Sequence, residues 1–348
     1  MLRGTLAFLA LVAFAVVGAE LRNLLARKGI RAPAMEGISF LLVGLALGSR
    51  GLGLFPEDLV TALRVVVLFG MAWIGLVFGV QMESRIIRRL APRQRWAGIL
   101  TPLWLGVPVT VGALGWGVSL DLALALGAIA MASSPTSLEG LVRGRRVADR
   151  SVMRLLKLEM AFAGIPAVAL FAAAASVASP LSAGKGGPIP VVDLVVVMLA
   201  VGALVGFALV VLIRGVREHI ELVTLAAGSM CLVAGATSVL GLSALPAAAC
   251  AGAVLVNRSY FPHRMLRVAH AWDRPILAAL LVLVGASWDG AAFSLPVFVV
   301  LTAARAIGAW VGGEFLSRTV GTEASETRPR HVGWGLLPQG ELALGLLV

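Results

Sequence analysis

Long apolar runs recur along the whole of this chain, and short polar connections separate them. Hydrophobic residues make up 59% of the sequence and charged residues 14%, whereas soluble domains are about half apolar and about a quarter charged. Runs of roughly 15–24 apolar residues are long enough to cross a bilayer as helices. The sequence therefore predicts an all-α polytopic membrane protein with about twelve transmembrane helices, at 5–19, 36–54, 65–82, 96–116, 121–141, 153–178, 190–213, 221–239, 243–256, 275–288, 292–316 and 332–348.

The basic residues are distributed unevenly over the connections between these segments. Of the 29 Lys and Arg residues, 24 lie in or beside the connections that follow odd-numbered segments. Because cytoplasmic connections carry an excess of Lys and Arg, this pattern predicts a multi-pass protein of the inner (plasma) membrane with its N-terminus outside. The net charge of +11 is then a signal of topology, and we expect no nucleic-acid partner.

The first hydrophobic segment has two interpretations. Residues 5–19 resemble a secretory signal with a small-residue cleavage site, but four basic residues follow them directly. We therefore expect a retained helix and keep the cleaved signal as the alternative. The absence of a long polar linker predicts a single membrane domain over residues 1–348.

Glycines occur four residues apart in several of the predicted helices. This spacing lets helix backbones approach closely in a bilayer, so we expect these glycines to serve helix packing. The pairs are Gly44 and Gly48, Gly75 and Gly79, Gly202 and Gly206, and Gly308 and Gly312.

Two of the apolar segments contain polar interruptions that include a proline. Proline removes a backbone hydrogen bond, and hydroxyl groups can satisfy the groups that it frees. The interrupting residues are Ser133, Ser134 and Pro135 in one segment, and Pro338, Gln339, Gly340 and Glu341 in the other. The two segments are expected to run in opposite directions, and paired broken helices of this kind indicate the binding site of a secondary transporter.

Two further charged residues lie within apolar segments. Arg305 is near the middle of segment 292–316, and Glu159 lies a short way into segment 153–178. A buried arginine without an anion is very unfavourable, so Arg305 is expected to pair with a carboxylate. Glu159 and Glu341 are the candidates.

Several motifs in this chain resemble the monovalent cation:proton antiporter superfamily, which includes the sodium/hydrogen exchanger membrane domain. The stretch "GAIAMASSPTS" is similar to its broken helix, "TAARAIG" to its arginine helix and "GWGLLPQGELALGL" to its glycine-glutamate helix. The resemblance implies two inverted repeats, a mobile core that slides against a scaffold, and a homodimer. It places the first repeat at 1–180, a linking helix at 190–213 and the second repeat at 220–348, with a thirteenth helix apparently missing.

The same resemblance draws attention to a departure in segment 153–178. Helix 6 of the superfamily often carries a glutamate that pairs with the arginine of helix 11, and this sequence matches them with Glu159 and Arg305. An asparagine and an ion-carrying aspartate usually follow the glutamate, but here Ala163 and Gly164 stand in their places. The resemblance thus implies that the structural ion pair is kept and that the transport carboxylate is lost.

These observations support two hypotheses about function. The first is a secondary transporter that exchanges Na⁺ or K⁺ for protons by alternating access, with altered or weak ion coupling. Glu341 is then the main candidate to titrate, with Glu159, Arg305, Ser133, Ser134 and Gln339 as the other site residues. The alternative is a transport-inactive homologue that acts as a membrane sensor or assembly subunit. No enzymatic activity, catalytic residue, cofactor or metal is expected, since no nucleophile–base pair can be identified.

Overall fold

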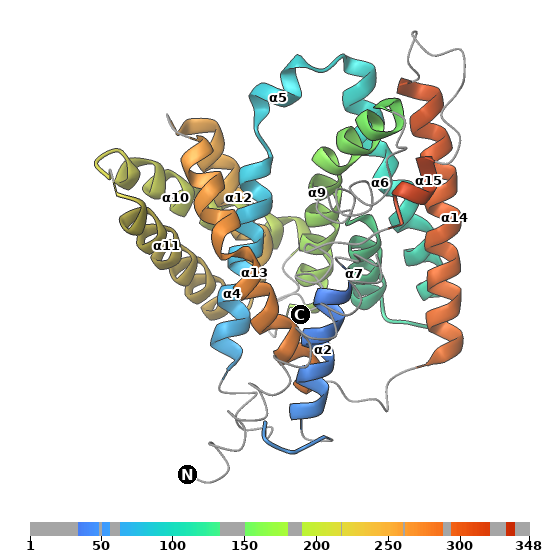
Figure 1. The fold of residues 1–348 in the computed structure, drawn as a ribbon, viewed down its shortest axis with the longest axis horizontal. Coiled ribbons are helices and arrows are strands. Elements are labelled where there is room, and N and C mark those ends of the chain that lie inside the picture. Colours follow the sequence, from blue (N-terminus) through green and yellow to red (C-terminus); the bar gives the residue numbers. More distant parts are fainter. Residues whose placement is uncertain are drawn as a thin grey trace, which may run out of the picture.

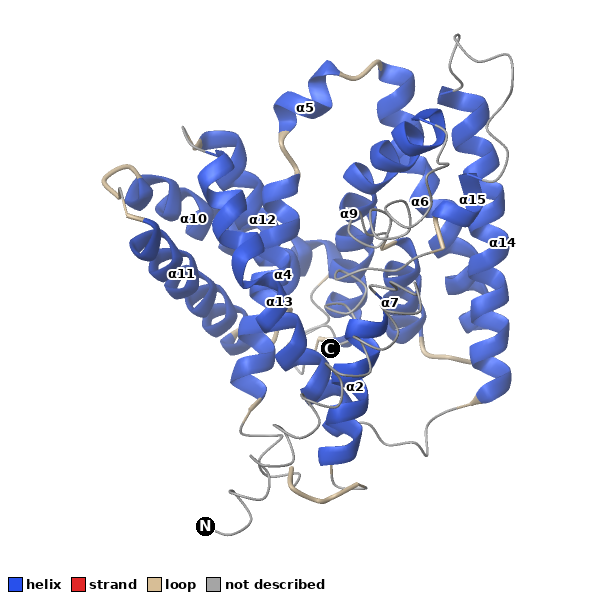
Figure 2. Ribbon diagram, in the orientation of Figure 1, coloured by secondary structure: helices blue, strands red, loops and turns tan. Residues whose placement is uncertain are grey.

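The computed structural model describes residues 34–48, 51–55, 63–132, 150–179, 190–216, 218–259, 262–287, 294–320 and 332–337. Within these ranges the regular secondary structure is helical throughout (Figure 2). The helices are α2 (Ala34–Leu47), α4 (Arg64–Gln81), α5 (Ser84–Arg89), α6 (Pro92–Gly115), α7 (Leu120–Met131), α9 (Arg150–Ala178), α10 (Val191–Ile213), α11 (His219–Val239), α12 (Ala244–Arg258), α13 (Pro262–Ser287), α14 (Leu295–Val320) and α15 (Val332–Gly335).

The observed helices agree closely with the apolar segments of the sequence. Segment 65–82 corresponds to α4 and segment 190–213 to α10, with ends that differ by one residue. Helix α2 ends at Leu47, although its apolar segment was predicted to reach residue 54. Two further stretches differ from the prediction: α5 was not expected, and α13 begins at Pro262, well before its apolar segment at 275–288. Both stretches are rich in arginine, so a search for apolar runs passes over them. The predicted segment 5–19 lies outside the described residues.

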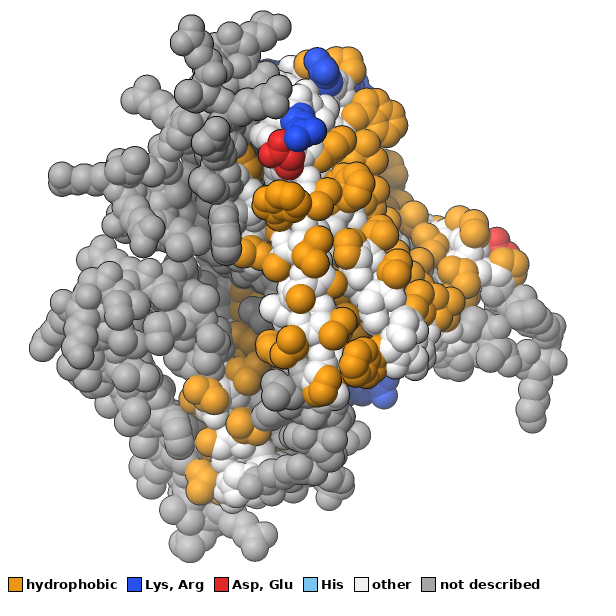
Figure 3. Space-filling model, turned by 90° about the vertical axis from the view of Figure 1, so that its right-hand side faces the viewer, with side chains coloured by type: hydrophobic (Ala, Val, Ile, Leu, Met, Phe, Trp, Pro, Cys, Tyr) orange, Lys and Arg blue, Asp and Glu red, His pale blue; other side chains and the backbone are white. Residues whose placement is uncertain are grey.

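Several of these helices have the length and composition of membrane spans. Among the described residues, five are long and apolar enough to cross a bilayer, and they belong to α4, α6, α10, α11 and α14. Beyond Asp193 in its first turn, helix α10 carries apolar residues at its exposed as well as its buried positions, and Leu204 is one of the exposed ones. On the side that carries α14, Figure 3 shows hydrophobic side chains spread over the described surface and few charged ones. Apolar residues both inside and outside are typical of a membrane protein.

The helices form two groups that share part of their core (Figure 1). In the first group α12 packs between α4 and α10, and α13 packs against α2 and α4. In the second group α6 packs against α14, α7 and α9. Phe78 of α4, Met131 of α7 and Phe171 of α9 meet in one buried cluster between the groups. Helix α5 is the connection along the chain from α4 to α6, and hence from one group to the other.

The glycine pairs lie where two helix backbones meet, which confirms their predicted role in packing. Gly44 of α2 and Gly48, directly after α2, face α13, and Gly75 and Gly79 of α4 face α12. Gly202 and Gly206 of α10 also face α12, and Gly308 and Gly312 of α14 face α6. A Cβ atom at Gly79 would meet the carbonyl oxygen of Ala249 and would lie 2.8 Å from the Cα atom of Gly252. Backbone atoms cannot move aside as a side chain can, so these contacts require glycine.

A Gly79→Ala variant should therefore be less stable by about 1–3 kcal/mol, the usual cost of overpacking a core. Thermal unfolding of the purified protein in detergent would measure the loss. Gly228→Ala is the matched control, because a methyl group added at Gly228 of α11 would have no other atom within 4 Å. Alanine favours helix over glycine by about 1 kcal/mol, so the control should be neutral or stabilising. Equal stability of the two variants would contradict the close α4–α12 contact.

Candidate functional site

Two helices end close to the interruptions that the sequence predicts. Helix α7 ends at Met131, and the backbone of Ala132 is already extended, just before Ser133. Helix α15 ends at Gly335, and Leu336 and Leu337 continue toward Pro338 without helical structure. The last carbonyl groups of a helix have no amide partner within that helix and carry its negative partial charge. Both ends therefore need hydrogen-bond donors.

Arg305 of α14 supplies donors to both of these helix ends. Its Nε atom donates to the carbonyl oxygen of Ala130 at 3.3 Å, in the last turn of α7. Its two terminal nitrogens donate to the carbonyl oxygens of Leu337 at 2.6 Å and Leu336 at 3.3 Å. The planar guanidinium group has five N–H donors in a fixed fork, which suits it to link several acceptors at once. One side chain thus joins the C-terminal ends of two helix segments that are far apart in the sequence.

Glu159 lies fully buried in α9, on the side of the second helix group. Leu156, one turn earlier, packs with Ala309 of α14 and Leu336 in a single hydrophobic cluster. The carboxylate of Glu159 interacts electrostatically with Arg305. Within the described residues the hydrogen bonds of Arg305 go to backbone carbonyls, and Arg305 and Glu159 form no ion pair with each other, so the expected pairing is seen only as an electrostatic attraction.

The positions of the two missing superfamily ligands lie in an apolar environment. Ala163 and Gly164 both belong to α9, where Ala163 is buried and Gly164 packs toward α4. A Cβ atom at Gly164 would lie 3.1 Å from Cδ1 of Phe78 and 3.8 Å from the terminal methyl group of Met82, both on the α4 side. The side chains nearest to a Cβ atom at Gly164 are thus an aromatic ring and a thioether. Neither group can ligate a hard cation such as Na⁺, which requires oxygen ligands.

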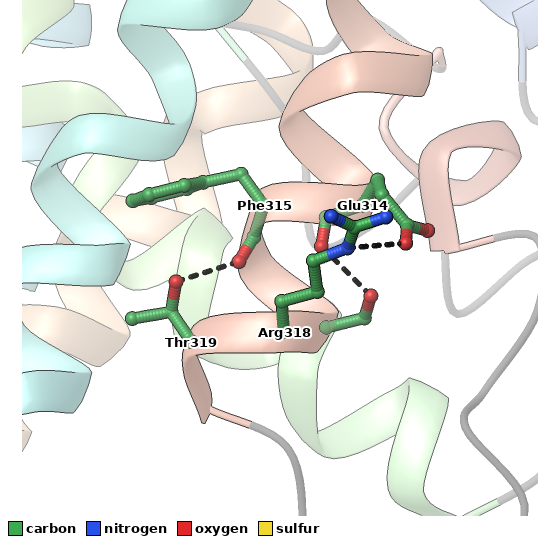
Figure 4. Close-up of polar contacts among 5 residues, drawn as sticks. Glu314, Phe315, Arg318 and Thr319 are labelled. Carbon is green, nitrogen blue, oxygen red and sulfur yellow. Dashed lines mark hydrogen bonds and ion pairs between the residues drawn. The ribbon is translucent and has the colours of Figure 1, made fainter.

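The remaining charges that the structure describes on α14 lie near its C-terminal end and pair with each other. Nε of Arg318 donates to Oε1 of Glu314 at 2.7 Å, one helical turn away, as Figure 4 shows. Both side chains are largely exposed. Glu314 therefore pairs with a residue of its own helix and takes no part in the hydrogen bonds of Arg305.

The structure places only some of the predicted site residues. Glu159, Arg305, Ala163 and Gly164 are described, whereas the other predicted residues lie outside the described ranges: Ser133, Ser134, Pro135, Pro338, Gln339, Gly340 and Glu341. Sequence reasoning also missed the carbonyls of Ala130, Leu336 and Leu337 as partners of Arg305. Their proximity to two proline-containing interruptions is the signal that could have suggested it, because helix ends leave carbonyl groups without partners.

Comparisons with known proteins give one family and one fold. The sequence model of the family "Sodium/hydrogen exchanger, transmembrane" matches residues 8–348. No curated protein is significantly similar to the chain. The fold is similar to that of the sodium proton antiporter MjNhaP1 from Methanocaldococcus jannaschii at pH 8, with a TM-score of 0.66 and 18% identity over 99% of this chain and 85% of that one. An electron-microscopy structure of the same antiporter gives a TM-score of 0.57 and 17% identity, over 98% and 84% of the two chains.

Proposed function

Because the chain belongs to the sodium/hydrogen exchanger transmembrane family, we propose that it exchanges a monovalent cation, Na⁺ or K⁺, for protons across the plasma membrane. Alternating access would move the two helix groups relative to each other, with the site carried by the group of α6, α7, α9, α14 and α15. We further propose an outside N-terminus, as the positive-inside pattern indicates, and a homodimer in the bilayer.

The single observation that best supports this proposal is the position of Arg305. Secondary transporters bind their substrates where interrupted helices meet at a repeat interface, and charged ends of half-helices form part of such sites. Arg305 binds the carbonyl end of α7 and the carbonyls that follow α15. A cation or proton bound between the same two interruptions would lie next to this arrangement.

We propose that Glu341 carries the proton. Antiport requires one group that holds either a proton or a cation, and the usual aspartate position is occupied by Gly164. Glu159 already interacts with Arg305, which leaves Glu341 as the carboxylate that follows the second interruption. Ser133, Ser134 and Gln339 would then supply neutral oxygen ligands. We expect the coupling between cation and proton at such a carboxylate to differ from that of superfamily members that carry an aspartate at the position of Gly164.

One observation favours the alternative, a transport-inactive membrane sensor or assembly subunit. Phe78 and Met82 line the space beside Gly164, where an ion-carrying aspartate would project. Apolar side chains at this point are expected in a protein that keeps the antiporter fold but no longer binds the ion. The two proposals differ in one measurable respect, which is cation-driven proton movement.

Purified protein in liposomes with an imposed proton gradient would decide between them. We expect addition of Na⁺ or K⁺ to dissipate the gradient, and we expect Glu341→Gln to abolish that response because the amide cannot release a proton. Glu314→Gln is the matched control, since Glu314 is an exposed carboxylate at the end of α14. Flux that persists in Glu341→Gln would remove Glu341 as the carrier. An intact protein that gives no response to either cation would favour the sensor or subunit.

A further inference from the structure

The short helix α5 and the start of α6 form a strongly basic linker between the two helix groups. Five arginines fall within eleven residues, at positions 85, 88, 89, 93 and 95, and the only acidic residue nearby is Glu83. The side chains of Arg85, Arg88, Arg89 and Arg93 are exposed. In the part of the chain that the structure describes, none of these four forms an ion pair or a side-chain hydrogen bond. Their charges are therefore available to a partner.

Amide side chains hold the backbone of this linker at both ends. The backbone N–H of Ser84 donates to Oδ1 of Asn257 at 2.8 Å, and Nδ2 of Asn257 donates to the carbonyl oxygen of Met82 at 3.0 Å. At the other end the backbone N–H of Ala91 donates to Oε1 of Gln94 at 3.2 Å. The fold thus fixes the course of the linker without using its guanidinium groups.

The tryptophans of α6 place this linker at the level of the lipid headgroups. Trp96 in the second turn of α6 and Trp116 directly after its last residue are both exposed, with 64% and 52% of their surface accessible. A helix rises 1.5 Å per residue, so their separation along the axis is about 30 Å, which matches the hydrocarbon thickness of a bilayer. Tryptophan is enriched at both membrane interfaces. The arginines lie directly beyond Trp96, where phosphate groups of lipids are found.

We propose that the linker formed by α5 and the first turn of α6 binds anionic phospholipid through Arg85, Arg88, Arg89 and Arg93. Clusters of basic residues next to a membrane span attract anionic lipid, whereas a zwitterionic lipid offers no net charge. On the proposed topology this lipid belongs to the cytoplasmic leaflet. Because α5 connects α4 of the first helix group to α6 of the second, bound lipid would hold a segment that must follow any movement between the groups.

The test uses the full-length protein and measures lipid binding, so it is independent of transport. Native mass spectrometry of the protein in detergent would count bound phosphatidylglycerol against bound phosphatidylcholine. An Arg88→Gln/Arg89→Gln variant should bind phosphatidylglycerol about 25-fold more weakly, at about fivefold for each arginine near an anionic headgroup. Raising the salt concentration should reduce the difference, because it screens charges near the surface.

An Arg64→Gln variant is the matched control, because Arg64 is an exposed arginine at the opposite end of α4. It should retain phosphatidylglycerol binding. Equal loss in the control, or no loss in the double variant, would overturn the proposal. So would an equal number of bound phosphatidylcholine molecules, or binding of a soluble acidic protein in place of lipid. Thermal unfolding of both variants in detergent would show that each is folded before its lipids are counted.

Discussion

An Arg305→Ala variant is expected to lower the free energy of unfolding by about 3–5 kcal/mol, because it leaves three backbone acceptors without their donor. The substitution removes the donors for the carbonyls of Ala130, Leu336 and Leu337. A buried acceptor left without a partner costs about 1–3 kcal/mol, so the carbonyls alone account for a loss of this size. It also leaves the carboxylate of Glu159 without the interaction that it makes with Arg305. Titration from mild to denaturing detergent would measure the loss.

Two further variants separate the charge of Arg305 from its shape. Lysine keeps the charge, but its compact ammonium group cannot reach acceptors on two helix ends as the guanidinium fork does. Arg305→Lys should therefore fall between the wild type and Arg305→Ala. Arg318→Gln removes an arginine from the same helix, and its exposed pair with Glu314 is worth only about 0.3–0.5 kcal/mol. If Arg305→Ala were as stable as Arg318→Gln, the linking role of Arg305 would be wrong.

Hydropathy was sufficient to predict most of the fold, because the bilayer selects helices by length and apolarity alone. Segment 190–213 was predicted almost to the residue as α10, and segment 65–82 as α4. The same reasoning failed for α5 and for the first half of α13, where arginines alternate with apolar residues. Those helices lie outside the purely apolar runs, so their formation depends on packing and on the interface, which hydropathy does not measure.

The candidate site was only partly predictable, for a different reason. An arginine inside an apolar segment such as Arg305 requires hydrogen-bond acceptors, and side-chain chemistry suggests a carboxylate first. Every residue carries a carbonyl group, however, so the sequence cannot show which of them the fold will bring to a given donor. Only the convergence of α7, α14 and the residues after α15 identifies Ala130, Leu336 and Leu337. The role of Glu341 remains a prediction, since that residue lies outside the described ranges.

A Gly164→Asp variant is expected to be strongly destabilised, by about 3–5 kcal/mol, although it restores the carboxylate that the superfamily usually carries there. The new side chain would begin 3.1 Å from the ring of Phe78 and close to Met82. Placing an ionised carboxylate against these two apolar side chains is costly, because neither of them can hydrogen-bond to it or balance its charge. The same detergent titration would measure the free energy of unfolding. We also expect Na⁺ to leave the stability of the variant unchanged, because the side chains of Phe78 and Met82 offer no oxygen ligand.

Gly164→Ala and Gly164→Asn separate added volume from added charge. A methyl group requires the ring of Phe78 to shift by a few tenths of an ångström, while alanine favours the helix by about 1 kcal/mol, so Gly164→Ala should stay near the wild type. Asparagine adds the shape of aspartate without its charge, and its effect should be intermediate. The contrary result is a stable Gly164→Asp protein whose melting temperature rises with Na⁺. That outcome would show that the space between α4 and α9 still accepts a hydrated ion, and it would move the proposed exchange site from Glu341 back to helix α9.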